Sequence, residues 1–189
     1  MKKLMITTLF LVAVFALTGC SEDNNPTSVS SVDKVKPSER TTIVDVALAV
    51  NAESGEFSTL IAAVVAADLV DALSGNGQLT VFAPTDEAFA LLDLNADNIG
   101  DLDQAALTNI LLYHVAKGRR MAEDVVSSDQ IRMLNRQRTM ISLMDGEAYI
   151  NDSMIIGTDV PADNGVIHVI NAVLLPETME SKMKVSQSR

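Results

Sequence analysis

Histidine is the residue type best suited to proton transfer near neutral pH, and this sequence has two, His114 and His168. A hydrolytic site would combine one of them with a carboxylate such as Asp86 and with a serine or a water molecule. The sequence contains neither the G-x-S-x-G turn that exposes a nucleophilic serine nor the H-E-x-x-H zinc motif. An envelope enzyme that uses His114 or His168 is therefore an alternative hypothesis, and we expect neither catalysis nor a cofactor.

Both histidines lie in apolar segments, LLYHV and NGVIHVINAVLLP. Helical spacing places His114 on the same face as Leu111, and strand alternation places His168 on the same face as Val166 and Ile170. A buried imidazole is costly unless its nitrogens find hydrogen-bond partners. We therefore expect both histidines to be structural.

One loop, DLNADNIGDLDQ at residues 93–104, partly matches a calcium-binding pattern. Asp93, Asn95 and Asp97 occupy positions 1, 3 and 5 of an EF-hand-like loop. The glycine stands at position 8 instead of 6, and Gln104 replaces the bidentate glutamate at position 12. The sequence therefore predicts no metal site, with this loop as a weak calcium candidate.

The amino-terminal segment has the features of a secretory signal peptide over residues 1–19. Lys2 and Lys3 precede an unbroken apolar run over residues 9–17, which is too short to span a bilayer. The run ends in L-T-G-C and resembles the bacterial lipobox, which implies lipidation of Cys20. We expect a lipid anchor at the bacterial cell envelope, at the outer membrane or cell surface.

Residues 20–40 are rich in serine, asparagine, proline and charge, which predicts a flexible tether from Cys20. Residues 177–189 predict a polar tail. Cys20 is the only cysteine, so no disulfide can form within the chain. The segment 41–176 is long enough for a single domain that is held together by its hydrophobic core.

The formal net charge is −11, and the charges are unevenly distributed. Residues 41–116 contain 11 acidic and no basic side chains, whereas residues 117–138 contain six basic and three acidic ones. The acidity argues against a nucleic-acid partner. The basic stretch at 117–138 is either a solvated surface with local ion pairs or a site for an acidic glycan.

Hydrophobic periodicity predicts helices in the first half and strands in the second, and hence an α+β fold. Helices are expected at 41–50, 57–73, after Thr85, at 103–114 and at 121–126. Strands are expected at 78–83, 129–134, 138–144, 147–156 and 166–175. Asp145 and Gly146 predict a tight hairpin turn.

Three phrases, TVFAPTDEAF at 80–89, LLYHV at 111–115 and NGVIHVINAVLLP at 164–176, together resemble the fasciclin-like (beta-Ig-H3/fasciclin) domain over Thr41–Pro176. The resemblance implies a wedge of two β-sheets in the C-terminal half, with several helices, mainly from the N-terminal half, packed around it. It also implies a surface module that binds matrix proteins, receptors or polysaccharides without a common catalytic reaction. We therefore expect an extracellular protein or polysaccharide as partner, besides the membrane itself.

The resemblance assigns a structural role to the motif residues, and it implies that Asp86 and nearby backbone are partners of His114. Two departures from the family pattern are Asn171, where the family usually has Asp, and a turn at 135–137 without glycine. The motif residues are Thr80, Phe82, Pro84, Thr85, Asp86, Phe89, Tyr113, His114, Asn164, Gly165, His168, Asn171 and Pro176.

Four side chains are candidates for contact with a partner. Asp159 lies in GTDVPADNG, at the place where some animal relatives carry an Asp-Ile phrase implicated in integrin binding, and loops on a rigid scaffold often carry binding. Arg119, Arg120 and Arg132 belong to the basic stretch.

Overall fold

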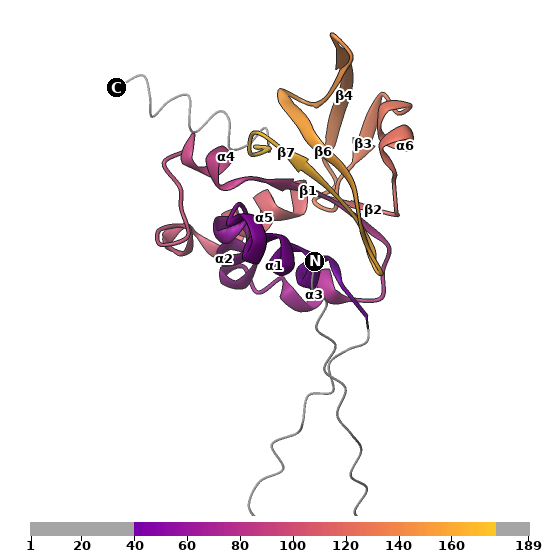
Figure 1. The fold of residues 1–189 in the computed structure, drawn as a ribbon. Coiled ribbons are helices and arrows are strands. Elements are labelled where there is room, and N and C mark those ends of the chain that lie inside the picture. The colour runs from indigo at the N-terminus through magenta and orange to yellow at the C-terminus, as the bar shows by residue number, and fades with distance from the viewer. Residues whose placement is uncertain (1–39, 177–189) are drawn as a thin grey trace, which may run out of the picture. The chain divides into compact units, whose positions relative to one another are not determined.

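The computed structural model describes residues 40–176 (Figure 1). The expected signal peptide, Cys20, all of the tether but Arg40, and the tail lie outside the described residues. The helical elements are α1 (Ile43–Ser54), α2 (Ser58–Ala66), α3 (Val70–Ser74), α4 (Asp86–Ala90), a 3-10 turn (Ile99–Asp101), α5 (Gln104–Tyr113) and α6 (Ala122–Val126). The strands are β1 (Leu79–Pro84), β2 (Val115–Lys117), β3 (Gln130–Arg132), β4 (Arg138–Met144), β5 (Glu147–Ile150), β6 (Ser153–Ala162) and β7 (Gly165–Ile170).

The α+β class is confirmed, but the two-sheet wedge is wrong. The strands form one seven-stranded sheet in the order β2-β1-β7-β6-β5-β4-β3. The pairing of β1 with β7 is parallel and all the others are antiparallel. The edge strands β2 and β3 approach each other, with a bridge between Ala116 and Met133, so the sheet almost closes on itself. Two sheets were expected from the family resemblance, and strand alternation could not correct this, because it identifies the two faces of a strand but not its neighbours.

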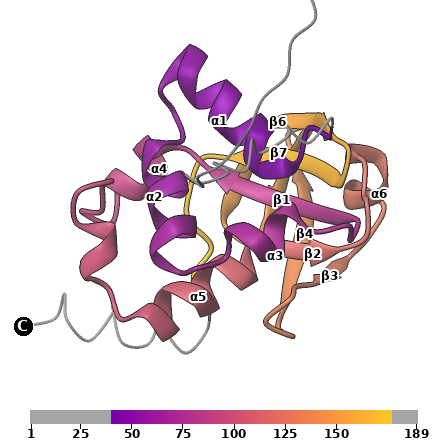
Figure 2. The same cartoon turned by 90° about the horizontal axis from the view of Figure 1, so that it is seen from below.

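The helices cover one side of the sheet (Figure 1; Figure 2). Helices α1, α2, α3 and α5 gather on the side of β1, whereas the short α6 lies across the sheet from them, next to β3 and β4. Strand β1 belongs to the helix-rich N-terminal half of the chain, and β7 belongs to the strand-rich C-terminal half. Their pairing inside the sheet joins the two halves. Every strand pairing recorded for the described residues lies within 79–170. Helices α1, α4 and α5 pack against strands of this sheet, and α2 and α3 share the same hydrophobic cluster.

Two hydrophobic clusters explain why β1 and β7 are apolar on both faces. Leu79, Val81 and Ile167 point to the cluster shared with the helices. Phe82 and Ile170 point to the second cluster, inside the curled sheet. A central strand covered on both faces shows a continuous apolar run instead of a simple alternation. Both clusters, as the structure describes them, lie within residues 40–176.

Several boundaries differ from the sequence expectations because polar residues adopt left-handed backbone. Asp68 has φ of 57° and ends α2, so the helix expected over 57–73 is two helices. Asn151 has φ of 51° and opens a turn that separates β5 from β6 within the expected strand 147–156. Asp145 and Gly146, with φ of 54° and 87°, form the expected hairpin turn between β4 and β5.

Candidate functional site

His114 lies at the end of α5 and is only 2 % exposed. Its Nε2 accepts a hydrogen bond from the backbone N–H of Leu174 at 2.9 Å, so the proton of the neutral ring lies on Nδ1. Nδ1 donates to the carbonyl oxygen of Ile110 at 2.8 Å. Burial lowers the pKa of His114 to about 4, although the Ile110 carbonyl acts in the opposite direction. The ring is therefore neutral at physiological pH, and both nitrogens are occupied.

His168 lies on β7, is fully buried, and has the opposite tautomer. Its Nδ1 accepts from the backbone N–H of Asp159 at 3.3 Å, and its Nε2 donates to the carbonyl oxygen of Arg120 at 2.9 Å. The ring packs against Phe82 with the centroids 5.5 Å apart. Neither histidine has a nitrogen left to take a proton from a substrate or to bind a metal. The arrangement instead lets each imidazole bridge two backbone segments.

The implied pairing of Asp86 with His114 is wrong, because both ring nitrogens of His114 bond to the backbone of Ile110 and Leu174. The Asp86 carboxylate accepts hydrogen bonds from the backbone N–H groups of Thr59, at 2.8 Å, and Ser58, at 3.2 Å, and from the Ser58 hydroxyl. These groups form the first turn of α2, whose own N-cap residue, Phe57, offers no side-chain acceptor. Partial burial acts to raise the pKa of Asp86, but the Ser58 and Thr59 hydrogen bonds outweigh it and hold the pKa below its usual value.

Other polar motif residues also bond to backbone far away in the sequence. Asn164 accepts from the N–H of Ile43 at 2.8 Å and donates to the carbonyl oxygens of Leu73 and Gly75. The Thr80 hydroxyl donates to the Gly118 carbonyl at 2.7 Å and accepts from the N–H of Arg120 at 2.9 Å. Asn164 thereby fixes α1 and α3, and Thr80 fixes the loop that follows β2.

The remaining motif residues support the same framework. The Tyr113 hydroxyl donates to the carbonyl oxygen of Arg138 at 3.2 Å, and the Thr85 hydroxyl caps α4. The Asn171 side chain accepts from the N–H of Met154 at 2.9 Å, a bond that an aspartate could also make, and here it carries no charge. Phe89, Gly165 and Pro176 are buried.

One oxygen of the calcium candidate, Asn95 Oδ1, and one of Asp159 accept hydrogen bonds within the domain. Asn95 Oδ1 accepts from the N–H groups of Asp97, at 2.9 Å, and Asn98, at 3.1 Å, which closes a turn. Asp159 lies in a bulge of β6 with φ of 58°, not in a loop, and its carboxylate accepts from the N–H of Ala122 at 2.8 Å. Within residues 40–176 no three His, Cys, Asp or Glu side chains form a group that could hold a metal ion.

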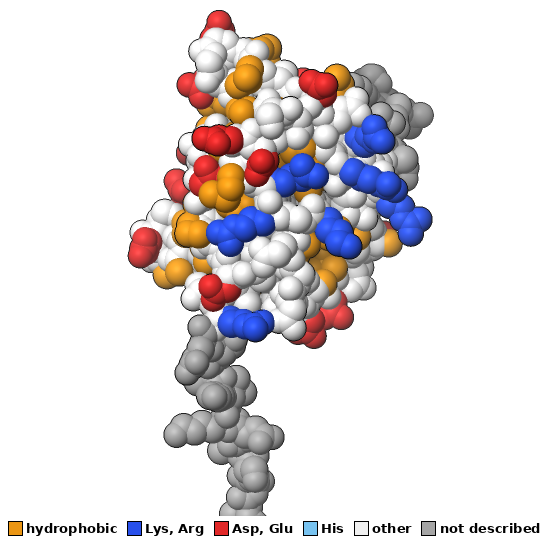
Figure 3. All heavy atoms as spheres, turned by 90° about the vertical axis from the view of Figure 1, so that its right-hand side faces the viewer, with side chains coloured by type: hydrophobic (Ala, Val, Ile, Leu, Met, Phe, Trp, Pro, Cys, Tyr) orange, Lys and Arg blue, Asp and Glu red, His pale blue; other side chains and the backbone are white. Residues whose placement is uncertain are grey.

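The basic stretch forms a surface on one side of the domain (Figure 3). We call its six cations, Lys117, Arg119, Arg120, Arg132, Arg136 and Arg138, the basic surface. No ion pair joins any of them to a carboxylate within the described residues. Of the alternatives that the sequence left open, the local ion pairs are absent from residues 40–176, whereas a solvated basic surface and a site for an acidic glycan both fit this arrangement.

Arg132 and Arg138 lie directly opposite each other on β3 and β4, and both side chains are exposed. Like charges in such cross-strand positions destabilise a sheet. Arg138 was not among the expected contact residues, because sequence alone does not give the register that brings it opposite Arg132. The Arg138 guanidinium contacts only the neutral Gln130 Oε1, at 3.1 Å, and its backbone carbonyl holds Tyr113.

A polar hollow of about 360 Å³ lies at one end of the basic surface. It is lined by Lys117, Arg119, Arg120, Asp124 and two serines, Ser127 and Ser128. The Arg120 side chain makes no hydrogen bond within residues 40–176, and its Nε is buried without a partner. Both serine hydroxyls already donate to the backbone carbonyl of Asp124, and Arg119 donates to the carbonyl of Ala162. An oxyanion in the hollow would therefore meet mainly the charges of Lys117 and Arg120.

The single curled sheet, the helices on one of its sides and the buried polar framework define a mixed α+β domain. The sequence profile of the Fasciclin domain matches residues 55–176, and the chain belongs to this family. Within the described residues, no helix combines the length and the apolar character needed to span a bilayer.

The chain is also similar in sequence to several individual proteins. Protein sll1483 of Synechocystis is 39 % identical over 185 residues, covering 91 % of this chain and 99 % of that protein. Immunogenic protein MPB70 of Mycobacterium bovis is 30 % identical over 165 residues, covering 84 % of this chain and 80 % of that protein. Transforming growth factor-beta-induced protein ig-h3 of Sus scrofa is 35 % identical over 122 residues, which are 64 % of this chain and 18 % of that longer protein.

The fold also matches a solved structure of a FAS1 domain pair from the insect cell adhesion molecule Fasciclin I. The TM-score is 0.60 with 20 % sequence identity, and the match covers 73 % of this chain and 52 % of the other. At this identity the match establishes the fold alone.

Proposed function

We propose that this protein is a non-catalytic adhesion module, attached to the bacterial envelope by lipid on Cys20. The lipobox-like sequence before Cys20 supports the anchor, and membership of the fasciclin family supports binding over chemistry. A tether of about 20 residues would hold the domain roughly 25 Å from the membrane surface. The histidines support the absence of catalysis, because all four ring nitrogens bond to backbone groups.

The anchor is tested by producing the full chain and its Cys20→Ser variant in a Gram-negative host fed with labelled palmitate. We expect label and membrane fractionation for the wild type only, and exposure of the domain at the outer membrane or cell surface. Unlabelled wild-type protein in the soluble fraction would contradict the anchor.

The observation that carries the binding function is the basic surface. Within residues 40–176, its six cations lack carboxylate partners, although residues 41–116 carry 11 acidic side chains, and two of the cations stand opposite each other in the sheet. Such an arrangement costs stability unless a ligand compensates it. The ligand that these features favour is an acidic polysaccharide, whose repeated carboxylates or sulfates match a row of guanidinium groups.

A panel of glycans and matrix proteins, probed with residues 38–189, tests this second part of the proposal. We expect binding to polyanionic glycans and little to neutral ones. Binding that survives charge reversal of Arg119, Arg120 and Arg132 would contradict the basic surface as the site. Binding only to matrix proteins would leave the adhesion module standing and exclude the glycan as its ligand.

A further inference from the structure

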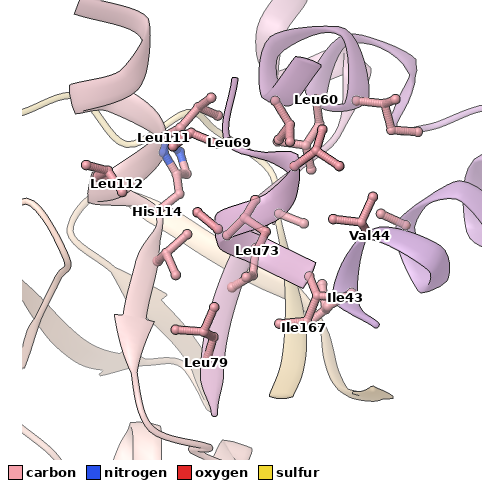
Figure 4. Close-up of a pocket in the computed structure, with 18 of the residues that line it drawn as sticks. Ile43, Val44, Leu60, Leu69, Leu73, Leu79, Leu111, Leu112, His114 and Ile167 are labelled. Atoms are coloured by element: carbon pink, nitrogen blue, oxygen red, sulfur yellow. The ribbon is translucent and has the colours of Figure 1, made fainter. Parts of the chain in front are cut away.

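An apolar cavity of about 240 Å³ lies between the helices and the sheet (Figure 4). Side chains from α1, α2, α3 and α5 form one part of its wall, and side chains from β1, β2 and β7 form the other. Natural protein interiors contain few voids larger than a water molecule. This cavity is larger than the space of about 150 Å³ that, in another protein, stays dry and takes up benzene.

The wall offers no polar group to a ligand or to water. Among the side chains drawn in Figure 4, only His114 carries nitrogen atoms. Both of these nitrogens already bond to Ile110 and Leu174. A buried water needs two or more polar partners, so the buried part of any occupant must be hydrocarbon.

The cavity is not fully closed by the helices. Leu48 of α1 and Val65 of α2 both line it, and they are 47 % and 61 % exposed. An apolar ligand therefore has an apolar entrance between these two helices. Three exposed acids lie on these elements, Asp45 on α1, Asp68 in the turn between α2 and α3, and Asp71 on α3, and residues 41–116 contain no basic side chain. A carboxylate at the entrance would be repelled, whereas a neutral or cationic head group would not.

From this combination we propose that the cavity is a binding site for a single aliphatic chain with an uncharged or cationic head group. The chain lies among Leu60, Val64 and Leu111, and the head group stays at the entrance beside Leu48 and Val65. The site shares no residue with the basic surface. It does not depend on the proposed anchor or on glycan binding, so either proposal stands if the other fails.

The test uses residues 38–189, which contain both hydrophobic clusters that the structure describes, and three probes that differ only in head group: decanol, decyltrimethylammonium and decanoate. Each is titrated below its micelle concentration and followed by calorimetry and by the melting temperature. We expect saturable binding and a raised melting temperature for the first two probes, with decanoate bound about tenfold more weakly. Absence of saturable decanol binding would overturn the proposal. Equal binding of decanoate would overturn the assigned head-group chemistry.

A matched pair of variants on α1 locates the site. Ala47 lines the cavity, whereas Ala52 lies on the same helix, is exposed and does not line it. Ala47→Leu places three more carbon atoms in the cavity and is expected to weaken decanol binding by about tenfold or more, whereas Ala52→Leu leaves it unchanged. Melting curves of both variants verify that they fold. Equal binding by a folded Ala47→Leu variant and the wild type would place the ligand elsewhere.

Discussion

The imidazole of His114 accepts a hydrogen bond from the backbone N–H of Leu174, 60 positions further along the chain, at 2.9 Å. This bond joins the end of α5 to the segment that follows β7, and thereby joins the second and third family motifs. The other ring nitrogen holds the Ile110 carbonyl within α5. This position therefore needs a neutral ring with one donor and one acceptor.

The neutral ring predicts that stability falls in acid. The pKa of His114 is about 4 in the folded protein because of burial, and its ordinary value is 6.5. Between these two pH values the unfolded chain binds a proton that the folded chain does not, so stability is full above pH 6.5 and declines toward pH 4. The expected loss is about 3 kcal/mol, from about 1.4 kcal/mol per pKa unit.

Urea unfolding of the wild type and of His114→Gln between pH 7 and 4 measures this effect. The variant is expected to be less stable at pH 7 and to have a flatter pH profile, and the difference between the profiles removes the contribution of the carboxylates. Parallel profiles for the two proteins would show that His114 does not titrate in this way.

Asp86→Ala is predicted to lower the free energy of unfolding by about 1–2 kcal/mol, because it leaves the first turn of α2 without its cap. The neighbouring Glu87→Ala is the control: Glu87 is exposed, and its loss should change stability by no more than about 0.5 kcal/mol. Chemical denaturation gives both values. An equal loss for the two variants would refute the capping role.

The sequence was sufficient for the fold class, because periodicity and turn chemistry are local properties. The helix expected at 41–50 is present and is capped by Thr42, and Asp145 and Gly146 form the expected hairpin turn between β4 and β5. Sheet closure was not predictable in this way, since the bridge between Ala116 and Met133 joins residues that no local pattern connects. The break at Asp68 was missed because the apolar residues on either side of it continue the helical spacing.

The candidate site was only partly accessible from the sequence, for the same reason. Apolar neighbours indicated that the histidines are buried, but their partners lie on distant backbone that carries no side-chain signal. The basic stretch was evident from charge alone. The pairing of Arg132 with Arg138 depends on the register of β3 and β4, which the structure supplies.

Gly165→Ala is predicted to be among the most damaging single substitutions. A Cβ at this position would overlap the carbonyl oxygen of Leu79 and lie 2.7 Å from Cδ1 of Ile43, where β7 passes β1 and α1. Gly77→Ala is the control, because no atom lies within 4 Å of its Cβ and its φ is not left-handed. We expect a lowered melting temperature or loss of soluble protein for the first variant only. Similar melting temperatures for the two would contradict the close packing.

Arg138→Glu is predicted to stabilise the domain while weakening its binding to an acidic glycan. The new carboxylate would stand opposite Arg132 and replace repulsion by attraction, for a gain of about 0.5 kcal/mol in unfolding free energy. Arg136→Glu makes the same charge reversal in the turn between β3 and β4. Residue 136 has no cross-strand partner, so this variant should show no such gain. Denaturation at low ionic strength separates the two variants. A destabilised Arg138→Glu protein would argue that the arginine pair is structural.

Affinity for an acidic polysaccharide as a function of salt tests the central claim most directly. Residues 38–189 are titrated with alginate, and with dextran as the neutral control, at ionic strengths on either side of about 0.15 M. We predict that alginate binding weakens steeply as the salt concentration rises and that dextran does not bind. The folded triple variant Arg119→Glu, Arg120→Glu, Arg132→Glu is expected to bind alginate at least about tenfold more weakly than the wild type. Alginate binding that is equal in the triple variant, or no binding to alginate at low salt, would contradict the basic surface as the contact site of this protein.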